Sequence, residues 1–101
     1  MIRDAVAPLP TGGRVLDLAC GNGVLGLEAL SARPDLTVTF ADISSQAVLS
    51  ASANAREPGV AGQCRLAHAD GVPAEAGRFQ RILLNPPFHE GGVVGDHIAL
   101  R

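Results

Sequence analysis

Three aspartates stand where predicted strands end, and carboxylates at such places commonly serve a polar ligand. Asp17, Asp42 and Asp70 each come at or near the carboxyl end of a short apolar segment. In an open α/β sheet the ligand crevice lies outside those ends. A single aspartate there is as often a helix cap or a turn residue. Three carboxylates in register, together with a glycine-rich segment, favour a shared ligand.

The glycine-rich segment has the spacing GxGxxG, from Gly21 to Gly26, between a predicted strand and a predicted helix. Glycines let the backbone approach a ligand closely, and Gly26 lets the helix settle on the sheet. Asp42 follows about 20 residues later, where an acid can accept both hydroxyls of a ribose. This pattern predicts an adenosine-containing ligand, either a dinucleotide or S-adenosylmethionine. Asp17, just before the loop, has no place in the dinucleotide pattern and favours S-adenosylmethionine.

Alternating strands and helices must position these groups. Strands are predicted over residues 14–18, 37–41, 64–69 and 79–84. One helix is predicted over residues 24–32, with Val24, Leu27 and Leu30 on one face, and a second begins after Ser44 or Ser45. This order predicts an α/β fold, a Rossmann-like open, mostly parallel sheet with flanking helices. We expect residues 1–101 to form a single, partial domain, truncated after the fourth strand.

The segment Asn85-Pro86-Pro87-Phe88 directly follows the fourth predicted strand. With the segment from Asp17 to Gly23, it resembles two motifs of the class I S-adenosylmethionine-dependent methyltransferases. The continuation through His89 and Gly91 is similar to the ribosomal RNA guanine-N2 methyltransferases and their methyltransferase small domain. The resemblance covers residues 13–101. It implies S-adenosyl-L-methionine as cofactor and the exocyclic N2 of guanine in ribosomal RNA as the methyl acceptor.

The resemblance also implies a role for each residue of the site. Asp17 would support the loop near the methionine end of the cofactor, Asp42 would hold the ribose, and Asp70 would accept the adenine amino group. The implied cofactor-binding residues are Asp17, Ala19, Cys20, Gly21, Asn22, Gly23, Asp42, Ile43, Asp70, Gly71 and Asn85. Ala19 departs from the glycine usual in the family, and Gln80 from a frequent aspartate. Cys20 is interpreted as a small loop residue rather than a reactive thiol.

Asn85, Pro86 and Phe88 are the predicted catalytic residues. The lone pair of a guanine amine is delocalised into the ring, so the nitrogen is a weak nucleophile. The Asn85 side-chain oxygen and the Pro86 carbonyl can accept hydrogen bonds from its two N–H groups. These bonds direct the lone pair and stabilise the developing positive charge. Phe88 offers a stacking face worth roughly 1–3 kcal/mol per base.

Composition and charge limit the partners. Eight arginines against ten acids give a net charge of −2, and the arginines are scattered. A stand-alone nucleic-acid binder has a basic footprint, so we expect another domain to supply most of the grip on RNA. Cysteines and histidines lack metal-ligand spacing, so no metal is expected. Without a membrane-spanning run or a signal peptide, the sequence predicts a cytoplasmic protein with no membrane partner.

Other interpretations stay open at this point. A protein glutamine or an adenine could accept the methyl group at a similar motif. A nicotinamide-dependent oxidoreductase would use the same glycine loop, and a non-catalytic fragment would bind cofactor only. An open edge on the fourth strand predicts that a missing carboxyl-terminal half or a second copy of the chain covers it.

Overall fold

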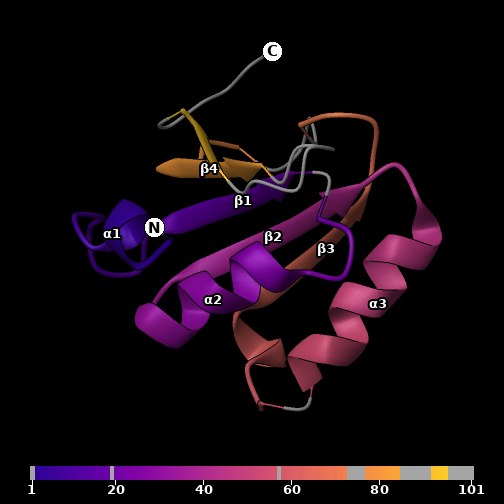
Figure 1. The fold of residues 1–101 in the computed structure, drawn as a ribbon, viewed down its shortest axis with the longest axis horizontal. Helices are drawn as coiled ribbons and strands as arrows, with labels where there is room; N and C mark the ends of the chain where they lie inside the picture. The colour runs from indigo at the N-terminus through magenta and orange to yellow at the C-terminus, as the bar shows by residue number, and fades with distance from the viewer. Residues whose placement is uncertain (1, 19, 57, 73–76, 85–91, 96–101) are drawn as a thin grey trace.

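A single sheet of five strands forms the centre of the molecule, in the order β3-β2-β1-β4-β5 (Figure 1). The computed structural model describes residues 2–18, 20–56, 58–72, 77–84 and 92–95. Its strands are β1 (Arg14–Leu18), β2 (Thr37–Asp42), β3 (Cys64–His68), β4 (Arg81–Leu84) and β5 (Gly92–Gly95). The first four run parallel to one another, and β5 is antiparallel to β4. The predicted α/β class with a mostly parallel sheet is confirmed.

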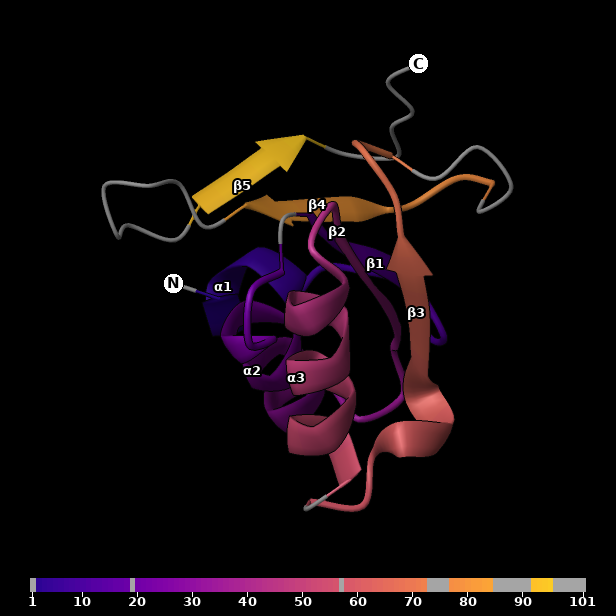
Figure 2. The same cartoon turned by 90° about the vertical axis from the view of Figure 1, so that its right-hand side faces the viewer.

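Helices cover one face of this sheet, as the two ribbon views show together (Figures 1 and 2). They are α1 (Ile2–Val6), α2 (Val24–Ala32) and α3 (Ser45–Arg56), with a 3-10 turn, η1 (Ala61–Gln63), before β3. The larger core cluster joins Val15, Val38, Phe40 and Leu83 of the sheet to apolar side chains of the helices. A smaller cluster lies on the other face: Leu16, Ala41, Phe79 and Ile82. None of the helices in the described part combines the length and apolar character needed to cross a bilayer.

The buried side of α2 matches the predicted face only in part. Leu25, Gly26, Ala29 and Leu30 are buried, whereas Val24 is 49% exposed. The reason is the close approach of the helix to β2 at Gly26. A Cβ atom added there would lie 2.9 Å from a Val38 methyl carbon, closer than real Cβ atoms come. The helix therefore rests on its glycine side: Leu30 is buried and Leu27 packs partly against the core, whereas Val24 lies outside it.

Helix α3 follows the prediction more closely. The Ser44 hydroxyl accepts a hydrogen bond from the Ala47 amide at 3.3 Å, as a residue that caps a helix does. The buried side chains are Val48, Ala51 and Ala55. Small residues on this side let the helix lie close to the sheet and to the loop that follows β1.

The edge of β4 was expected to be covered by a missing carboxyl-terminal half or by a second copy, whereas a strand of the same chain covers it. The antiparallel strand β5 pairs with it, with Leu83 opposite Val93 and Leu84 opposite Gly92. The segment Gly92-Val93-Val94-Gly95 carries too few apolar residues between glycines for a strand prediction. Backbone hydrogen bonding to the free edge of β4 decides its conformation instead.

The strand order reverses between β1 and β4. From β1 the chain proceeds to β2 and β3 on one side, then returns so that β4 pairs with the opposite side of β1. Open α/β sheets bind their ligands at such a switch point, outside the carboxyl ends of the strands. The predicted site residues that the structure describes come from the strand ends and loops at this end.

Candidate functional site

The loop after β1, residues 20–23, is a tight turn tied to the neighbouring strand. The Gly23 amide donates to the Cys20 carbonyl at 2.8 Å, and the Cys20 amide donates to the Ala41 carbonyl of β2 at 2.9 Å. Gly21 has φ 56°, a left-handed value that side chains disfavour. Apart from Gly21 itself and its two chain neighbours, no heavy atom of the described residues lies within 4 Å of the position where its Cβ would be. The loop therefore presents bare backbone to open space, where a ligand can approach it closely.

Asp17 is buried beneath this loop, at 1% exposure. One of its carboxylate oxygens accepts a hydrogen bond from the Gly26 amide at 2.9 Å. Gly23, which caps α2, has no side chain to fill that role, so a strand residue satisfies the first turn of the helix instead. The other carboxylate oxygen, Oδ1, is buried and has no partner among the described residues. Burial is the main reason that the pKa of Asp17 rises to about 7; the Gly26 amide lowers it, and the nearby Asp42 raises it further.

Asp42 ends β2 and faces the same loop. Its Oδ2 atom accepts from the Gly21 amide at 3.0 Å, and its Oδ1 atom accepts from the Ser44 amide at 2.9 Å. An ionised carboxylate has about four acceptor sites, so each oxygen retains capacity for another donor. The side chain is half-buried and already oriented by two backbone amides. This geometry suits a diol, which brings two adjacent hydroxyl donors.

A hollow of about 240 Å³ lies at the carboxyl ends of the strands, beside Asp42. Its lining residues are Leu18, Asp42, Ile43, Ala69, Asp70, Gly71 and Leu84. Ile43 is 65% exposed, so a large apolar side chain is available to a ligand at its rim. Pockets for drug-sized ligands measure about 300–1,000 Å³, so this hollow alone has room for only part of such a ligand.

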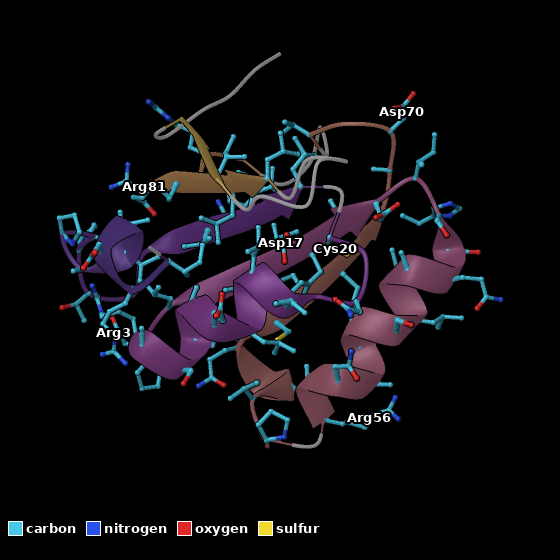
Figure 3. The ribbon with its side chains drawn as sticks, in the orientation of Figure 1. Arg3, Asp17, Cys20, Arg56, Asp70 and Arg81 are labelled. Atoms are coloured by element: carbon cyan, nitrogen blue, oxygen red, sulfur yellow. The ribbon has the colours of Figure 1, made fainter. Side chains whose placement is uncertain are left out.

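The structure brings most of the predicted residues to one end of the sheet, but the three acids are not in register. Asp17 pairs with Phe40 of β2, whereas Asp42 pairs with His68 of β3. Figure 3 shows Asp17 and Cys20 near the start of α2, and Asp70 at the outer end of the loop after β3. Asp17 is a buried support, Asp42 lies between loop and hollow, and Asp70 is an exposed rim residue. The three carboxylates thus occupy three depths rather than one row.

Cys20 lies inside the loop with its thiol buried. Burial, followed by the nearby carboxylates of Asp17 and Asp42, raises the pKa of this thiol to about 12. A thiol held protonated is a poor nucleophile, which agrees with its interpretation as a small loop residue. Ala19, Asn85, Pro86 and Phe88 lie outside the described residues, as do His89 and His97. The described part contains no group of three or more His, Cys, Asp or Glu that could hold a metal ion.

Two polar side chains around the site were not predicted as part of it. A ring nitrogen of His68, at the end of β3, lies 2.7 Å from the Ile43 carbonyl. The Asn54 amide of α3 donates to the Asn22 carbonyl in the loop at 2.8 Å. Both contacts join segments far apart in the sequence, so spacing alone gives no indication of them. The apolar lining residues Leu18, Ala69 and Leu84 were also missed, because they read as ordinary strand and turn residues.

Comparison with known families now adds to this geometry. The model of the methyltransferase small domain matches residues 4–101. The chain belongs to the methyltransferase small domain family. That match includes the loop after β1, Asp42, and the segment after β4 that contains Asn85 and Phe88.

Curated relatives of this family member are longer proteins. Ribosomal RNA large subunit methyltransferase G of Alcanivorax borkumensis is 47% identical over 93 residues, which are 92% of this chain and 24% of that protein. The protein of the same name from Klebsiella pneumoniae is 40% identical over 95 residues, covering 91% of this chain and 25% of its own length. The chain thus spans about a quarter of the curated relatives that it matches.

Solved structures agree with the fold. TrmN from Thermus thermophilus superposes with a TM-score of 0.71 and 31% identity, over 85% of this chain and 27% of that one. Coclaurine N-methyltransferase bound to N-methylheliamine and SAH gives a TM-score of 0.70 and 25% identity, over 86% and 26% of the two chains. The methyltransferase small domain described here therefore has the Rossmann-like fold of known methyltransferases.

Proposed function

We propose that this chain is the cofactor-binding part of an S-adenosyl-L-methionine-dependent RNA methyltransferase. The observation that carries the proposal is the position of Asp42. Its carboxylate is oriented by the Gly21 and Ser44 amides, and it lies between the open glycine loop and the hollow at the strand ends. If Asp42 binds the ribose of an adenosine-containing ligand, the groups on either side of the ribose would lie in the hollow and over the loop.

The residues present fit this cofactor. The Oδ1 atom of Asp17, which has no hydrogen-bond partner in the part of the chain that the structure describes, marks a buried polar group at the loop, and open space at Gly21 admits a ligand against the backbone. Ile43 offers an apolar surface for a base at the rim, and Asp70 and Gly71 lie on the same rim. The other proposed cofactor residues belong to the loop after β1 or, in one case, follow β4 in sequence: Ala19, Cys20, Asn22, Gly23 and Asn85.

Nitrogen is the proposed acceptor atom, and guanine N2 of ribosomal RNA the proposed position. When bound, the cofactor supplies an electrophilic methyl group. In sequence Asn85, Pro86 and Phe88 follow Leu84, whose strand partner is Leu18 at the end of β1. Asn85 and Pro86 would accept hydrogen bonds from the N–H groups of the amine, and Phe88 would stack on the base. Positioning of the two reactants would supply most of the rate enhancement, since effective molarity can lower the activation barrier by about 7–11 kcal/mol.

An RNA substrate is supported by the names of the curated relatives, which are ribosomal RNA methyltransferases. The net charge of −2 implies that another part of the protein supplies the grip on RNA. We therefore propose that residues 1–101 act as one domain within a larger assembly in the cytoplasm. Self-association, or pairing of a further segment with an outer strand of the sheet (β3 or β5), belongs to the same proposal.

A two-stage experiment tests the function. Calorimetric titration of the chain with S-adenosylhomocysteine and with NADH comes first, and binding of S-adenosylhomocysteine alone is expected. Binding of NADH alone would assign the chain to the oxidoreductases. In the second stage, labelled S-adenosylmethionine and deproteinised ribosomal RNA are incubated with the chain inside its full-length protein, and the RNA is digested to nucleosides. Label in N2-methylguanosine is expected; label in methyladenosine, or on protein, would overturn the guanine assignment.

A further inference from the structure

Asn54 lies on α3, 32 residues from the loop that it contacts. Its side-chain Nδ2 donates to the main-chain carbonyl of Asn22 at 2.8 Å. The side chain is exposed, so this bond is not needed to satisfy a buried group. Its effect is on the loop, because it ties a backbone carbonyl between Gly21 and Gly23 to a rigid helix.

The bond anchors one end of a peptide whose other end is also anchored. The carbonyl of the Asn22–Gly23 peptide accepts from Asn54, and its N–H donates to the Cys20 carbonyl at 2.8 Å. Gly23 has φ 87°, and a glycine at this place would otherwise allow the peptide plane to rotate. With both ends bonded, rotation breaks two hydrogen bonds together. The orientation of this peptide is thus decided by α3 as well as by the loop itself.

The same turn of α3 also packs against the loop at Gly23. A Cβ atom added to Gly23 would lie 3.0 Å from the Ala51 methyl carbon and 3.3 Å from a Phe40 ring carbon. Ala51 and Asn54 are three residues apart, so they share one side of the helix. Ala51 sets how closely the loop approaches the helix, and Asn54 sets how its peptide is turned.

We propose that Asn54 is a positioning residue for the cofactor, fixing the Asn22–Gly23 peptide so that the loop is already shaped for the amino-acid end of the ligand. This inference rests on the proposed function. A preformed loop does not have to be ordered on binding, which improves affinity without any direct contact between Asn54 and the ligand. Only ligands that reach the loop gain from this. The adenosine part is held at Asp42 and the hollow, and because the Ser44 amide also fixes the Asp42 carboxylate, its binding should depend little on Asn54.

Asn54→Ala and Asn54→Asp test the inference, with Ser50→Ala, at another exposed position of the same helix, as the matched control. Titration with S-adenosylhomocysteine should show about three- to tenfold weaker binding for Asn54→Ala, as expected for one lost hydrogen bond. Asn54→Asp should bind more weakly still, because it places an acceptor against the Asn22 carbonyl. Ser50→Ala should bind as the unmodified chain does. Adenosine, measured by ligand-observed NMR, should bind all variants within twofold of the unmodified chain.

Thermal unfolding without ligand separates positioning from a purely structural role. Loss of the hydrogen bond and the higher helix propensity of alanine act in opposite directions, so Asn54→Ala should unfold close to the temperature of the unmodified chain. Equal affinity of Asn54→Ala and the unmodified chain for S-adenosylhomocysteine would overturn the inference, and so would parallel losses for S-adenosylhomocysteine and adenosine. Failure of the unmodified chain to bind S-adenosylhomocysteine would instead overturn the proposed function.

Discussion

The two ends of the sheet use charged side chains in opposite ways. At the amino ends of the strands, the Arg33 guanidinium donates to the carbonyls of Val6, Ala7, Leu9 and Pro10 and pairs with Asp35 at 2.8 Å. Arg81 donates to the Ala5 carbonyl of α1 at 2.9 Å, and Figure 3 shows it beside that helix. At the carboxyl ends, Asp17 has an oxygen without a partner among the described residues, and Asp42 keeps acceptor sites free.

This difference separates anchoring from binding. Arg33 joins the carboxyl end of α1 to the loop after it, and Asp35 also accepts from the Gly12 amide at 2.8 Å. The hydrogen bonds from Arg33 and Gly12 hold the pKa of Asp35 well below its ordinary value. Charged side chains whose hydrogen-bonding sites are already occupied by neighbouring groups have few sites left for a ligand. Carboxylates with unused acceptor sites remain available for one, at some expense in stability.

The largest effect is expected at Asp42. Asp42→Ala removes the acceptor for both ribose hydroxyls, and hydrogen bonds to a charged group are worth about 1.5–3 kcal/mol each. Affinity for S-adenosylhomocysteine should therefore fall by about a hundredfold or more, as measured by calorimetry. Asp42→Asn keeps one acceptor, so its affinity should lie between those of the unmodified chain and of Asp42→Ala. Retention of full affinity in Asp42→Ala would show that the ribose lies elsewhere.

A smaller effect is expected for Asp17→Asn, on stability and its pH dependence. The folded pKa of about 7 lies above the ordinary value of 3.8, so the folded state holds a proton that the unfolded state releases. Stability must therefore decrease as pH rises between these values, by about 1.4 kcal/mol per pH unit at most. Above pH 7 the decrease in the free energy of unfolding is complete. Discounted for relaxation around the group, it should amount in total to roughly 2–4 kcal/mol.

Chemical unfolding without ligand at pH 5 and pH 8 measures this. The unmodified chain should be more stable at pH 5, and Asp17→Asn should lose most of that difference. Equal pH dependence in both proteins would mean that Asp17 does not carry the titration.

The smallest effect is expected for Arg33→Lys, and it should appear in stability alone. A lysine ammonium cannot span the four carbonyls that the planar guanidinium reaches. The melting temperature should fall by about 5 °C in a thermal scan. Affinity for S-adenosylhomocysteine, measured well below that temperature, should stay within twofold. Arg56→Lys, at the exposed end of α3, is the matched control. A loss of affinity for Arg33→Lys would remove the distinction between the two ends of the sheet.

Local sequence determined most of the elements of this protein. The strand over residues 14–18 and the helix over residues 24–32 have the predicted bounds, and Ser44 caps α3 as expected. Such features depend on neighbours within a few positions, which a single sequence displays directly. The glycine loop and the acids near the strand ends were also visible in this way.

Tertiary structure alone decided how those groups are used. It placed Asp17 beneath α2 as a cap, left Asp70 exposed, and turned α2 onto its glycine side. It also paired β5 with β4 and brought Asn54 to the Asn22 carbonyl. These outcomes depend on contacts between segments distant in sequence, whose free energies are set by packing and desolvation rather than by residue spacing. Spacing along the chain determined which groups gather at the carboxyl ends, and packing decided which of them support the loop and which face a ligand.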